Sequence, residues 1–352
     1  MKIASIVGAR PQFIKCALLS KELRKLHQEI IVHTGQHYDY EINEVFYNEL
    51  EIPQPDYNLG VGSGTHGEQT GRMLEKVEMI LIQEKPDFVL VYGDTNSTIA
   101  GALAAAKIHI KLGHVEAGLR SFDKSMPEEI NRVLTDHCSN YLFCPTQIAV
   151  DNLKREEIVR DVYLTGDVMV DVLFFNSKIA ERSQILDTLN LKDRQYLVAT
   201  IHRASNTNNR QNMENIVDAF CELGRNLVFP LHPRTKKSLQ EYGLYDKLRD
   251  KIKLIGPLGY IDFLKLLSHA NKILTDSGGI QKEAYIFRVP CITLRDSTEW
   301  VETVEGGWNL LVGTDKEKII KAAEGFNPSE EQSNIFWQGA CRKISEIVSR
   351  VL

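Results

Sequence analysis

Short apolar runs alternate with longer segments of helical spacing along the whole chain, and this alternation restricts the fold more than any other feature. Runs such as residues 2–7 and 88–92 are largely apolar on both faces, as expected of buried strands. Residues 11–27 instead repeat their apolar side chains at helical spacing, for example at Ile14 and Leu18. Strands that alternate with helices predict an α/β fold whose parallel sheets are covered by helices on both faces.

The same pattern sets the expected elements and domains. Strands are expected at residues 2–7, 29–33, 88–92, 109–115, 141–144, 162–164, 196–201, 227–231, 252–255, 272–274, 291–294 and 310–312. Helices are expected at residues 11–27, 41–50, 70–84, 95–107, 128–137, 147–155, 169–182, 213–223, 236–242, 260–269, 280–287, 316–324 and 331–351. A chain of 352 residues exceeds one ordinary core. We therefore expect two doubly wound Rossmann-like domains, at residues 1–168 and 169–330, that face each other across a ligand cleft.

Composition argues against several classes of protein. The net charge is −5 with no basic run, which argues against a nucleic-acid partner. No apolar stretch reaches membrane-spanning length, and the start of the chain is typical of a first strand rather than of a signal peptide. The six cysteines are scattered without metal-ligand spacing, so we expect buried thiols in a cytoplasmic protein and no metal site.

Polar residues follow the predicted strands at a consistent place. In open parallel sheets, ligands bind outside the carboxyl ends of the strands. This position is occupied in both halves of the chain, by Arg10, Asp94, His114, Glu116, His202, Arg203, His232, Arg234 and residues 276–279. The sequence therefore predicts one site formed between the two domains.

The stretch from residue 113 to residue 132, GHVEAGLRSFDKSMPEEINR, carries the acid–base candidates. Glu116 lies just past a strand end, and Glu128 follows Pro127 at a predicted helix start. Folding does not require carboxylates at these places, whereas acid–base chemistry does. The structural alternatives are a salt bridge from Glu116 to Arg120 and, for Asp94, an ordinary helix cap.

Residues 275–283, TDSGGIQKE, predict a phosphate site. Ser277 and the free N–H groups at a helix start suit an anion, and Glu283 suits a ribose diol. The alternative is a glycine-rich connector that Ser277 caps. The first strand lacks the dinucleotide glycine motif and the chain lacks a Walker lysine, which argues against NAD and against an ATPase. The residues available to neutralise a diphosphate are Arg10, Lys15, Arg120, Arg132, Arg203 and Arg234. The glycine-rich residues 60–71 either fold over a substrate or form a surface connection.

Together these motifs resemble the non-hydrolysing UDP-N-acetylglucosamine 2-epimerases. The resemblance runs through VGARPQFIK, GQH, GDTNST, HVEAGLRS, PEEINR, TGD, the His202-Arg203 pair, HPRT, TDSGGIQKEA and LVGTD, which cover nearly the whole chain. It implies the two-domain GT-B architecture, a last helix at residues 331–352 that packs back on the N-terminal domain, no cofactor, and a homodimer.

The resemblance also implies residue roles. Members of the family invert C2 of the sugar by removing its proton and expelling UDP, which then adds back to a 2-acetamidoglucal. The matching catalytic positions are Asp94, Glu116, Glu128 and His202. The matching positions for the UDP-sugar are Arg10, Lys15, Arg132, His232, Ser277, Gly278, Gly279 and Glu283. Which carboxylate takes the C2 proton is left open.

Several segments depart from the common pattern. Tyr38-Asp39 replaces the usual Arg-Gln, which bears on activation by a second UDP-GlcNAc. Trp300 and Trp308 resemble relatives that epimerise modified sugars such as UDP-2,3-diacetamido-2,3-dideoxy-glucuronate. The expected activity is UDP-GlcNAc 2-epimerisation. The alternatives are that modified sugar, a hydrolysing epimerase, a GT-B glycosyltransferase and a non-catalytic nucleotide-sugar-binding protein.

Overall fold

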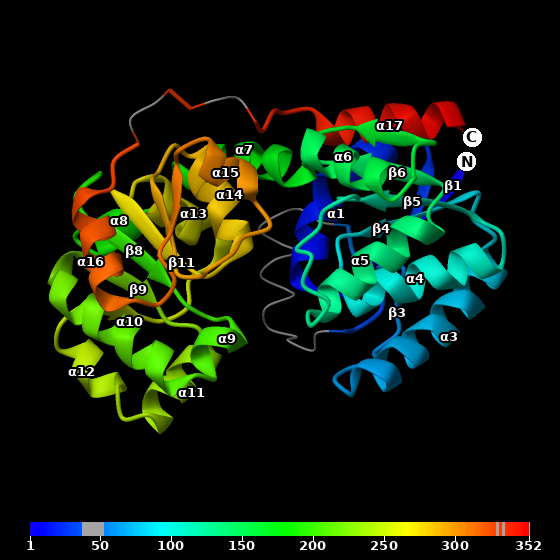
Figure 1. The fold of residues 1–352 in the computed structure, drawn as a ribbon. Coiled ribbons are helices and arrows are strands. Elements are labelled where there is room, and N and C mark those ends of the chain that lie inside the picture. Colours follow the sequence, from blue (N-terminus) through cyan, green and yellow to red (C-terminus); the bar gives the residue numbers. More distant parts are fainter. Residues whose placement is uncertain (37–52, 329–330, 333–334, 352) are drawn as a thin grey trace. The chain divides into compact units, whose positions relative to one another are not determined.

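The computed structural model describes residues 1–36, 53–328, 331–332 and 335–351, apart from the side chains of Arg10 and Arg225. The expected helix at residues 41–50, together with His37, Tyr38 and Asp39, lies outside the described residues. The chain divides into two compact units (Figure 1). The first unit comprises Met1–Phe175 and Phe336–Leu352, and the second comprises Asn176–Ile335.

The first unit is built on a parallel sheet in the order β3-β2-β1-β4-β5-β6-β7. Its strands are β1 Lys2–Val7, β2 Gln28–His33, β3 Tyr57–Asn58, β4 Phe88–Tyr92, β5 Lys111–Val115, β6 Tyr141–Cys144 and β7 Val162–Leu164. Its helices are α1 Arg10–Leu23, α3 His66–Glu84, α4 Asn96–Lys107, α5 Pro127–Cys138, α6 Gln147–Arg155, α7 Val168–Ala180, which continues into the second unit, and α17 Ala340–Val351.

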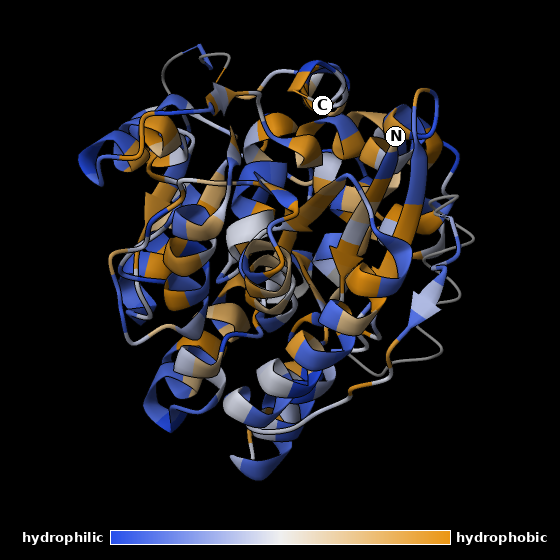
Figure 2. Cartoon of the chain, turned by 90° about the vertical axis from the view of Figure 1, so that its right-hand side faces the viewer, coloured by the Kyte–Doolittle hydropathy of each residue, from blue (hydrophilic) through white to orange (hydrophobic). Residues whose placement is uncertain are grey.

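The core of the first unit follows from its buried strands. β4 is buried along its whole length, and the side chains of Val89 and Val91 share one apolar cluster with Val77 and Leu81 of α3. α4 can approach the sheet closely because a side chain on Gly101 would meet Ile6 and Val91 at 3.1 Å. In Figure 2 the strands are largely coloured as hydrophobic, whereas the helices carry stretches of both colours.

The second unit repeats this plan with the parallel order β10-β9-β8-β11-β12-β13. Its strands are β8 Leu197–Thr200, β9 Leu227–Pro230, β10 Lys253–Ile255, β11 Lys272–Thr275, β12 Cys291–Thr293 and β13 Asn309–Leu311. Its helices are α8 Ile185–Thr188, α9 Ala204–Thr207, α10 Arg210–Leu223, α11 Pro233–Glu241, α12 Tyr245–Arg249, α13 Tyr260–Ser268, α14 Gly278–Ile286, α15 Val301–Glu305 and α16 Lys316–Gly325, with a 3₁₀ turn at Gly224–Asn226.

Several elements differ from those expected. The short helices α8, α9, α12 and α15 were not expected, and α1 ends at Leu23 rather than at residue 27. The short strand β3 was not expected from the sequence. α3 begins at His66 rather than residue 70, because Thr65 caps it by accepting from the Glu68 N–H. α17 begins at Ala340 rather than at residue 331. At this start the Asp171 carboxylate accepts from the backbone N–H groups of Gly339 (2.6 Å) and Cys341 (2.8 Å). α17 packs on α1 within the first unit.

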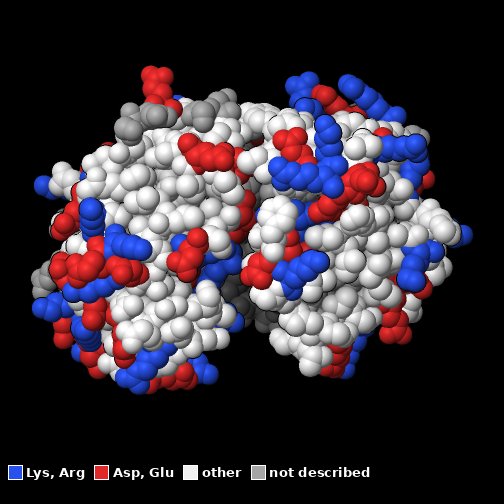
Figure 3. All heavy atoms as spheres, in the orientation of Figure 1, with Lys and Arg blue, Asp and Glu red and all other residues white. Residues whose placement is uncertain are grey.

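The surface charge, the apolar character of the helices and the arrangement of metal-ligating residues concern possible binding partners. On the face drawn in Figure 3, acidic and basic side chains lie in small interspersed groups. Among the described residues, no helix combines the length and the apolar character that crossing a membrane requires. Within the same residues, no cluster of three or more His, Cys, Asp or Glu is placed to hold a metal ion.

Candidate active site

Two turns of the first unit leave the same edge of its sheet. Tyr92 of β4 pairs with Val115 of β5, so the residues that follow these two strands begin side by side. Gly93 continues the pairing because its N–H donates to the Val115 carbonyl at 3.0 Å. Asp94 and Glu116 therefore lie on neighbouring turns, at the carboxyl edge where the sequence predicted a site.

Glu116 has a left-handed backbone, with φ at +75°. This conformation costs a residue with a side chain about 1–2 kcal/mol. The N–H groups of Glu116 and Ala117 hold the turn by donating to the Phe143 carbonyl, both at 3.1 Å. Strain of this kind persists where the surroundings fix it, and it is common at functional sites.

The Glu116 carboxylate forms an ion pair with Lys15 of α1. A side chain on Gly93 would lie 3.1 Å from the Lys15 Nζ and 3.3 Å from the Glu116 Oε2, so this pair packs directly against the Gly93 backbone. The alternative salt bridge from Glu116 to Arg120 is wrong. Arg120 instead bonds Asp136 and Glu156, and its side chain is 1% exposed.

Asp94 is held from α5. Its carboxylate pairs with Arg132, and its carbonyl accepts from the Asn131 amide at 3.0 Å. Burial alone would lower the pKa of Arg132, but the carboxylates of Asp94 and Glu129 outweigh that effect, and the pKa is raised. The cap of α4 is Thr95, not Asp94, so capping does not account for the Asp94 side chain.

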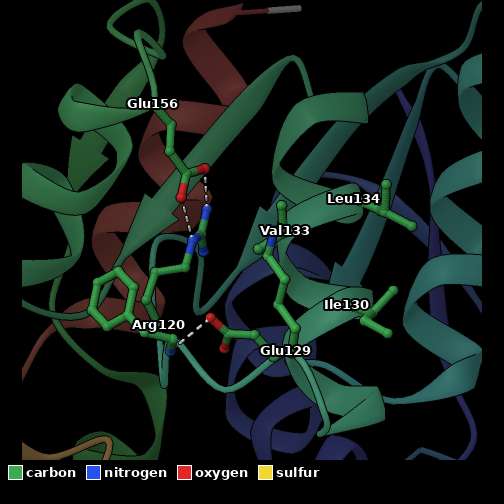
Figure 4. A pocket seen from close by; sticks show the side chains of 8 residues that line it. Arg120, Glu129, Ile130, Val133, Leu134 and Glu156 are labelled. Atoms are coloured by element: carbon green, nitrogen blue, oxygen red, sulfur yellow. Dashed lines mark hydrogen bonds and ion pairs between the residues drawn. The ribbon is translucent and has the colours of Figure 1, made fainter.

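The two glutamates after Pro127 have separate environments. Glu128 is exposed on the first turn of α5. Glu129 is buried and accepts from the backbone N–H groups of Ser121 and Phe122, each at 2.9 Å. It also bonds Arg132 at 3.2 Å. Figure 4 shows the Glu129 side chain beside Arg120. Glu129 thus anchors the loop, and Glu128 remains the accessible carboxylate.

In the second unit, His202 and Asp276 leave the sheet together, because Thr200 pairs with Thr275. The Asp276 carboxylate lies 3.2 Å from the His202 Nδ1 and accepts from the backbone N–H groups of His202 (3.1 Å) and Arg203 (3.0 Å). Burial raises the pKa of Asp276, but these hydrogen bonds and the His202 ring outweigh it and the pKa is lowered. Asp276 therefore fixes the ring by its Nδ1, while the side chain of His202 remains 43% exposed.

His232 lies near His202, with ring centroids 5.9 Å apart. It caps α11, since its Nδ1 accepts from the Arg234 N–H at 3.2 Å. Arg234 is exposed on the first turn of that helix. This placement orients the His232 ring beside His202 through a backbone contact.

The predicted phosphate segment begins α14. Ser277 is its N-cap residue, but the Ser277 hydroxyl makes no capping hydrogen bond, so the capping alternative does not explain the side chain. Gly279 is exposed, and Glu283 is buried further along the helix. A side chain on Gly278 would meet the Glu299 Oε1 at 2.0 Å, so a carboxylate packs against this helix start.

Sequence reasoning missed Glu299 and the ring-holding role of Asp276. Glu299 pairs with Arg203 at 3.2 Å and with Arg295 at 2.9 Å. Burial raises the pKa of Glu299, yet the two arginines outweigh it and the pKa is lowered. An acid directly after an apolar strand was a usable signal for Asp276, whereas nothing near Glu299 in the chain indicates its pairing with Arg203.

The remaining predicted residues lie in the same two places. Arg10 is the first residue of α1, and its side chain is outside the described part. Of the glycine-rich residues 60–71, those from His66 onward belong to α3, so the segment is a loop only before that helix. The structure thus brings Asp94, Glu116, Lys15 and Arg132 together in the first unit, and His202, His232 and the α14 start are carried by the second.

Comparison with known proteins decides the family. The family model described as UDP-N-acetylglucosamine 2-epimerase matches residues 21–349. The chain belongs to the UDP-N-acetylglucosamine 2-epimerase family. The predicted family, and the prediction that the chain is an isomerase, are confirmed.

Individual members of the family are similar over nearly the whole chain. A UDP-N-acetylglucosamine 2-epimerase homolog of Methanococcus maripaludis is 59% identical over 95% of each chain. The UDP-2,3-diacetamido-2,3-dideoxy-D-glucuronate 2-epimerase of Pseudomonas aeruginosa is 50% identical, over 92% of this chain and 91% of that one. The crystal structure of the Methanocaldococcus jannaschii UDP-GlcNAc 2-epimerase with UDP-GlcNAc and UDP is 49% identical, covers 99% of this chain and 100% of that one, and has a TM-score of 0.91. The predicted fold class, with two doubly wound units of the GT-B type, is confirmed.

Proposed function

We propose that this epimerase interconverts UDP-GlcNAc and UDP-ManNAc by elimination and re-addition of UDP. A base takes the C2 proton, and the electron pair of that C–H bond forms the C1–C2 double bond. The C1–oxygen bond breaks, and UDP leaves with its electrons. In the return step a UDP oxygen adds to C1, and a proton is delivered to the opposite face of C2.

The observation that carries the proposal is the pair of carboxylates on neighbouring strand ends. Inversion at C2 requires an acid–base group for each face of the sugar. Glu116 and Asp94 supply two such groups, each positioned by a cation, Lys15 and Arg132 respectively. The exposed Glu128 is a third. The C2 proton is weakly acidic, so the same cations also stabilise the charge that develops during its removal.

The second unit supplies the groups for UDP in this proposal. The N–H groups at the start of α14, with Ser277, Gly278 and Gly279, suit the diphosphate. Glu283 suits the ribose diol, and His232 completes the UDP contacts assigned to this unit. Arg10 of the first unit is assigned to UDP as well. His202, held at its Nδ1 by Asp276, has its Nε2 available to steady or protonate the leaving phosphate.

A second candidate substrate is UDP-2,3-diacetamido-2,3-dideoxy-glucuronate. One observation favours it, the similarity to the Pseudomonas aeruginosa enzyme. The Trp300 ring is buried, has the Lys282 Nζ 4.0 Å from its centroid, and places its Nε1 3.5 Å from where a Gly278 side chain would begin. Replacing Trp300 is therefore expected to alter the packing at the start of α14, which is assigned to the diphosphate.

Proton NMR in D2O separates the candidate activities. With UDP-GlcNAc we expect UDP-ManNAc that carries deuterium at C2 and retains UDP. Free ManNAc and UDP would instead identify a hydrolysing epimerase. Turnover of the diacetamido-glucuronate sugar alone would establish the second substrate. Turnover of neither sugar, in a protein that still binds UDP, would favour a binding protein or a glycosyltransferase over an epimerase.

A charge-neutral substitution tests the role of Glu116. Glu116→Gln keeps the size of the side chain but removes the base, and we expect kcat to fall by at least about 100-fold. UDP affinity, measured by calorimetry, should change by less than about threefold, because Glu116 is not among the residues assigned to UDP. A loss of UDP affinity as large as the loss of kcat would make Glu116 a binding residue.

We also propose a cytoplasmic homodimer. All six cysteines are free thiols, as is usual in a reducing compartment. Phe122, Ile130 and Leu134 are 73%, 49% and 48% exposed beside a surface pocket of about 380 Å³ (Figure 4), and this is an apolar face for a second copy. Leu134→Glu should convert a dimer to a monomer in size-exclusion light scattering, and an unchanged dimer would place the interface elsewhere.

A further inference from the structure

A buried chain of charged groups lies behind the two catalytic turns. His114 at the end of β5 and Asp136 on α5 are both fully buried, with Nδ1 and Oδ1 2.6 Å apart. The His114 Nε2 lies 2.7 Å from the Gly93 carbonyl. A carboxylate and a carbonyl can only accept, so each ring nitrogen of His114 faces an acceptor.

Asp136 reaches the second turn with its other oxygen. Its Oδ2 accepts from the Gly118 N–H at 3.1 Å and from the Arg120 Nη1 at 2.7 Å. Burial raises the pKa of Asp136, but His114 and Arg120 outweigh it and the pKa is lowered. The Asp136 carboxylate therefore stays charged while it bonds His114, Arg120 and the backbone.

These bonds end on the residues that flank the two candidate carboxylates. Gly93 immediately precedes Asp94, and Gly118 follows Glu116 by two positions. Both glycines have positive φ, +63° and +80°. A side chain on Gly118 would come within 2.3 Å of the Ala149 carbonyl, so this turn has little room to adopt another path. One aspartate thus connects the Asp94 turn, through His114, to the Glu116 turn.

Stability alone does not account for such a chain. Arg120 closes it with a bidentate contact to Glu156, both bonds at 2.7 Å, so the guanidinium faces two carboxylates, Asp136 and Glu156. Buried charges lose solvation, and well-packed apolar residues of similar volume are often as stable or more so. A buried ionic network that ends on two functional turns is instead suited to fixing their geometry.

We propose that Asp136 and His114 are positioning residues for the epimerase reaction. They hold the Gly93 and Gly118 turns together. They thereby fix the positions of the Asp94 and Glu116 carboxylates relative to each other, and so relative to the bound sugar. This inference rests on the proposed function. It predicts a loss in the chemical step rather than in nucleotide binding, because neither Asp136 nor His114 is among the residues assigned to UDP.

The test compares Asp136→Asn with Glu29→Gln. Glu29 is a matched control because it is a buried carboxylate of the same unit, accepting from Ser5 at 2.7 Å and Arg24 at 2.9 Å. It lies near the amino end of β2, away from the carboxyl edge. Well below both melting temperatures, we expect Asp136→Asn to lower kcat by about 10- to 100-fold, with KM within about twofold. Glu29→Gln should lower stability and leave kcat within about twofold.

Two further measurements keep the outcome decisive. His114→Gln keeps a donor for the Gly93 carbonyl, so it should retain more of kcat than His114→Ala. In wild-type protein labelled with ¹⁵N in histidine, both ring nitrogens of His114 should carry protons. An unprotonated nitrogen, or equal losses of kcat in Asp136→Asn and Glu29→Gln, would overturn the inference. A wild-type protein that turns over neither sugar would refute the proposed function, and with it this role.

Discussion

The adjacent residues Glu128 and Glu129 provide a sharp test of how the structure divides two carboxylates between folding and chemistry. Glu128 is exposed, whereas the side chain of Glu129 is 5% exposed and bonds the Ser121 and Phe122 backbone as well as Arg132. Replacing each by Gln removes one charge at almost constant size. Glu129→Gln should therefore destabilise the first unit, and Glu128→Gln should abolish turnover in a protein that is as stable as wild type.

The size of the Glu129 effect follows from its hydrogen bonds. The Oε2 accepts from the Ser121 N–H and hydroxyl (2.9 and 2.8 Å), and the Oε1 accepts from the Phe122 N–H (2.9 Å). Glutamine keeps one acceptor oxygen and presents an NH₂ group to the other donor. One charge-assisted bond is lost, at about 1.5–3 kcal/mol, and a buried N–H is left unpaired, at about 1–3 kcal/mol. The two contributions add to about 2.5–6 kcal/mol, and we expect a total near the lower bound, about 3 kcal/mol.

Thermal unfolding measures the stability of both variants, and a turnover assay measures their kcat. A loss of about 3 kcal/mol lowers the melting temperature of a unit of this size by about 6–12 °C. Exposed substitutions stay within about 0.5 kcal/mol, so Glu128→Gln should melt with wild type while kcat falls by about 100-fold or more. If Glu129→Gln melts together with Glu128→Gln, the anchoring role is refuted. If Glu128→Gln retains full kcat, only its catalytic assignment is lost.

Two further predictions concern each unit in turn. Gly93→Ala places a methyl group 3.1 Å from the Lys15 Nζ in a left-handed backbone. It should lower the free energy of unfolding by about 1–2 kcal/mol and lower kcat by displacing the Lys15–Glu116 pair. An unchanged kcat would argue against that placement of the pair. Asp276 has a pKa below its ordinary value of 3.8, so its contribution to stability is present above that value and is lost as pH falls through the lowered pKa. Asp276→Asn should therefore be less stable at pH 7 and lose less stability on acidification, which urea unfolding from pH 7 to pH 2 would measure.

The sequence was sufficient to place the strand ends. Strands apolar on both faces, such as β4, have sharp boundaries because the polar turn follows at once, and Asp94 and Glu116 were located in this way. Short elements were harder: β3 has two residues, too few for any periodic pattern. The start of α3 was recognisable, since Thr65 and Glu68 have the spacing of a capping pair within the glycine-rich stretch.

The sequence did not predict which charged residues form ion pairs with each other. Arg120 is four residues from Glu116, and the obvious local pairing was wrong, because α5 and the end of α6 bring Asp136 and Glu156 to it instead. Glu129 was likewise indistinguishable from Glu128 until the loop at Ser121 was placed against it. Such pairings depend on how helices far apart in sequence pack, which local spacing does not encode.

In both units, buried carboxylates fix the turns by accepting hydrogen bonds from backbone N–H groups. The residues after a strand lose the hydrogen bonds of the sheet, and their N–H groups need other acceptors. Asp136 accepts from Gly118, Glu129 from Ser121 and Phe122, and Asp276 from His202 and Arg203. A carboxylate fixed from a neighbouring helix or strand replaces water as the acceptor, so each turn keeps one geometry without ladder pairing. The loops that carry the candidate catalytic groups are thus ordered by side chains, and this explains why conservative changes at non-reacting acids should disturb turnover.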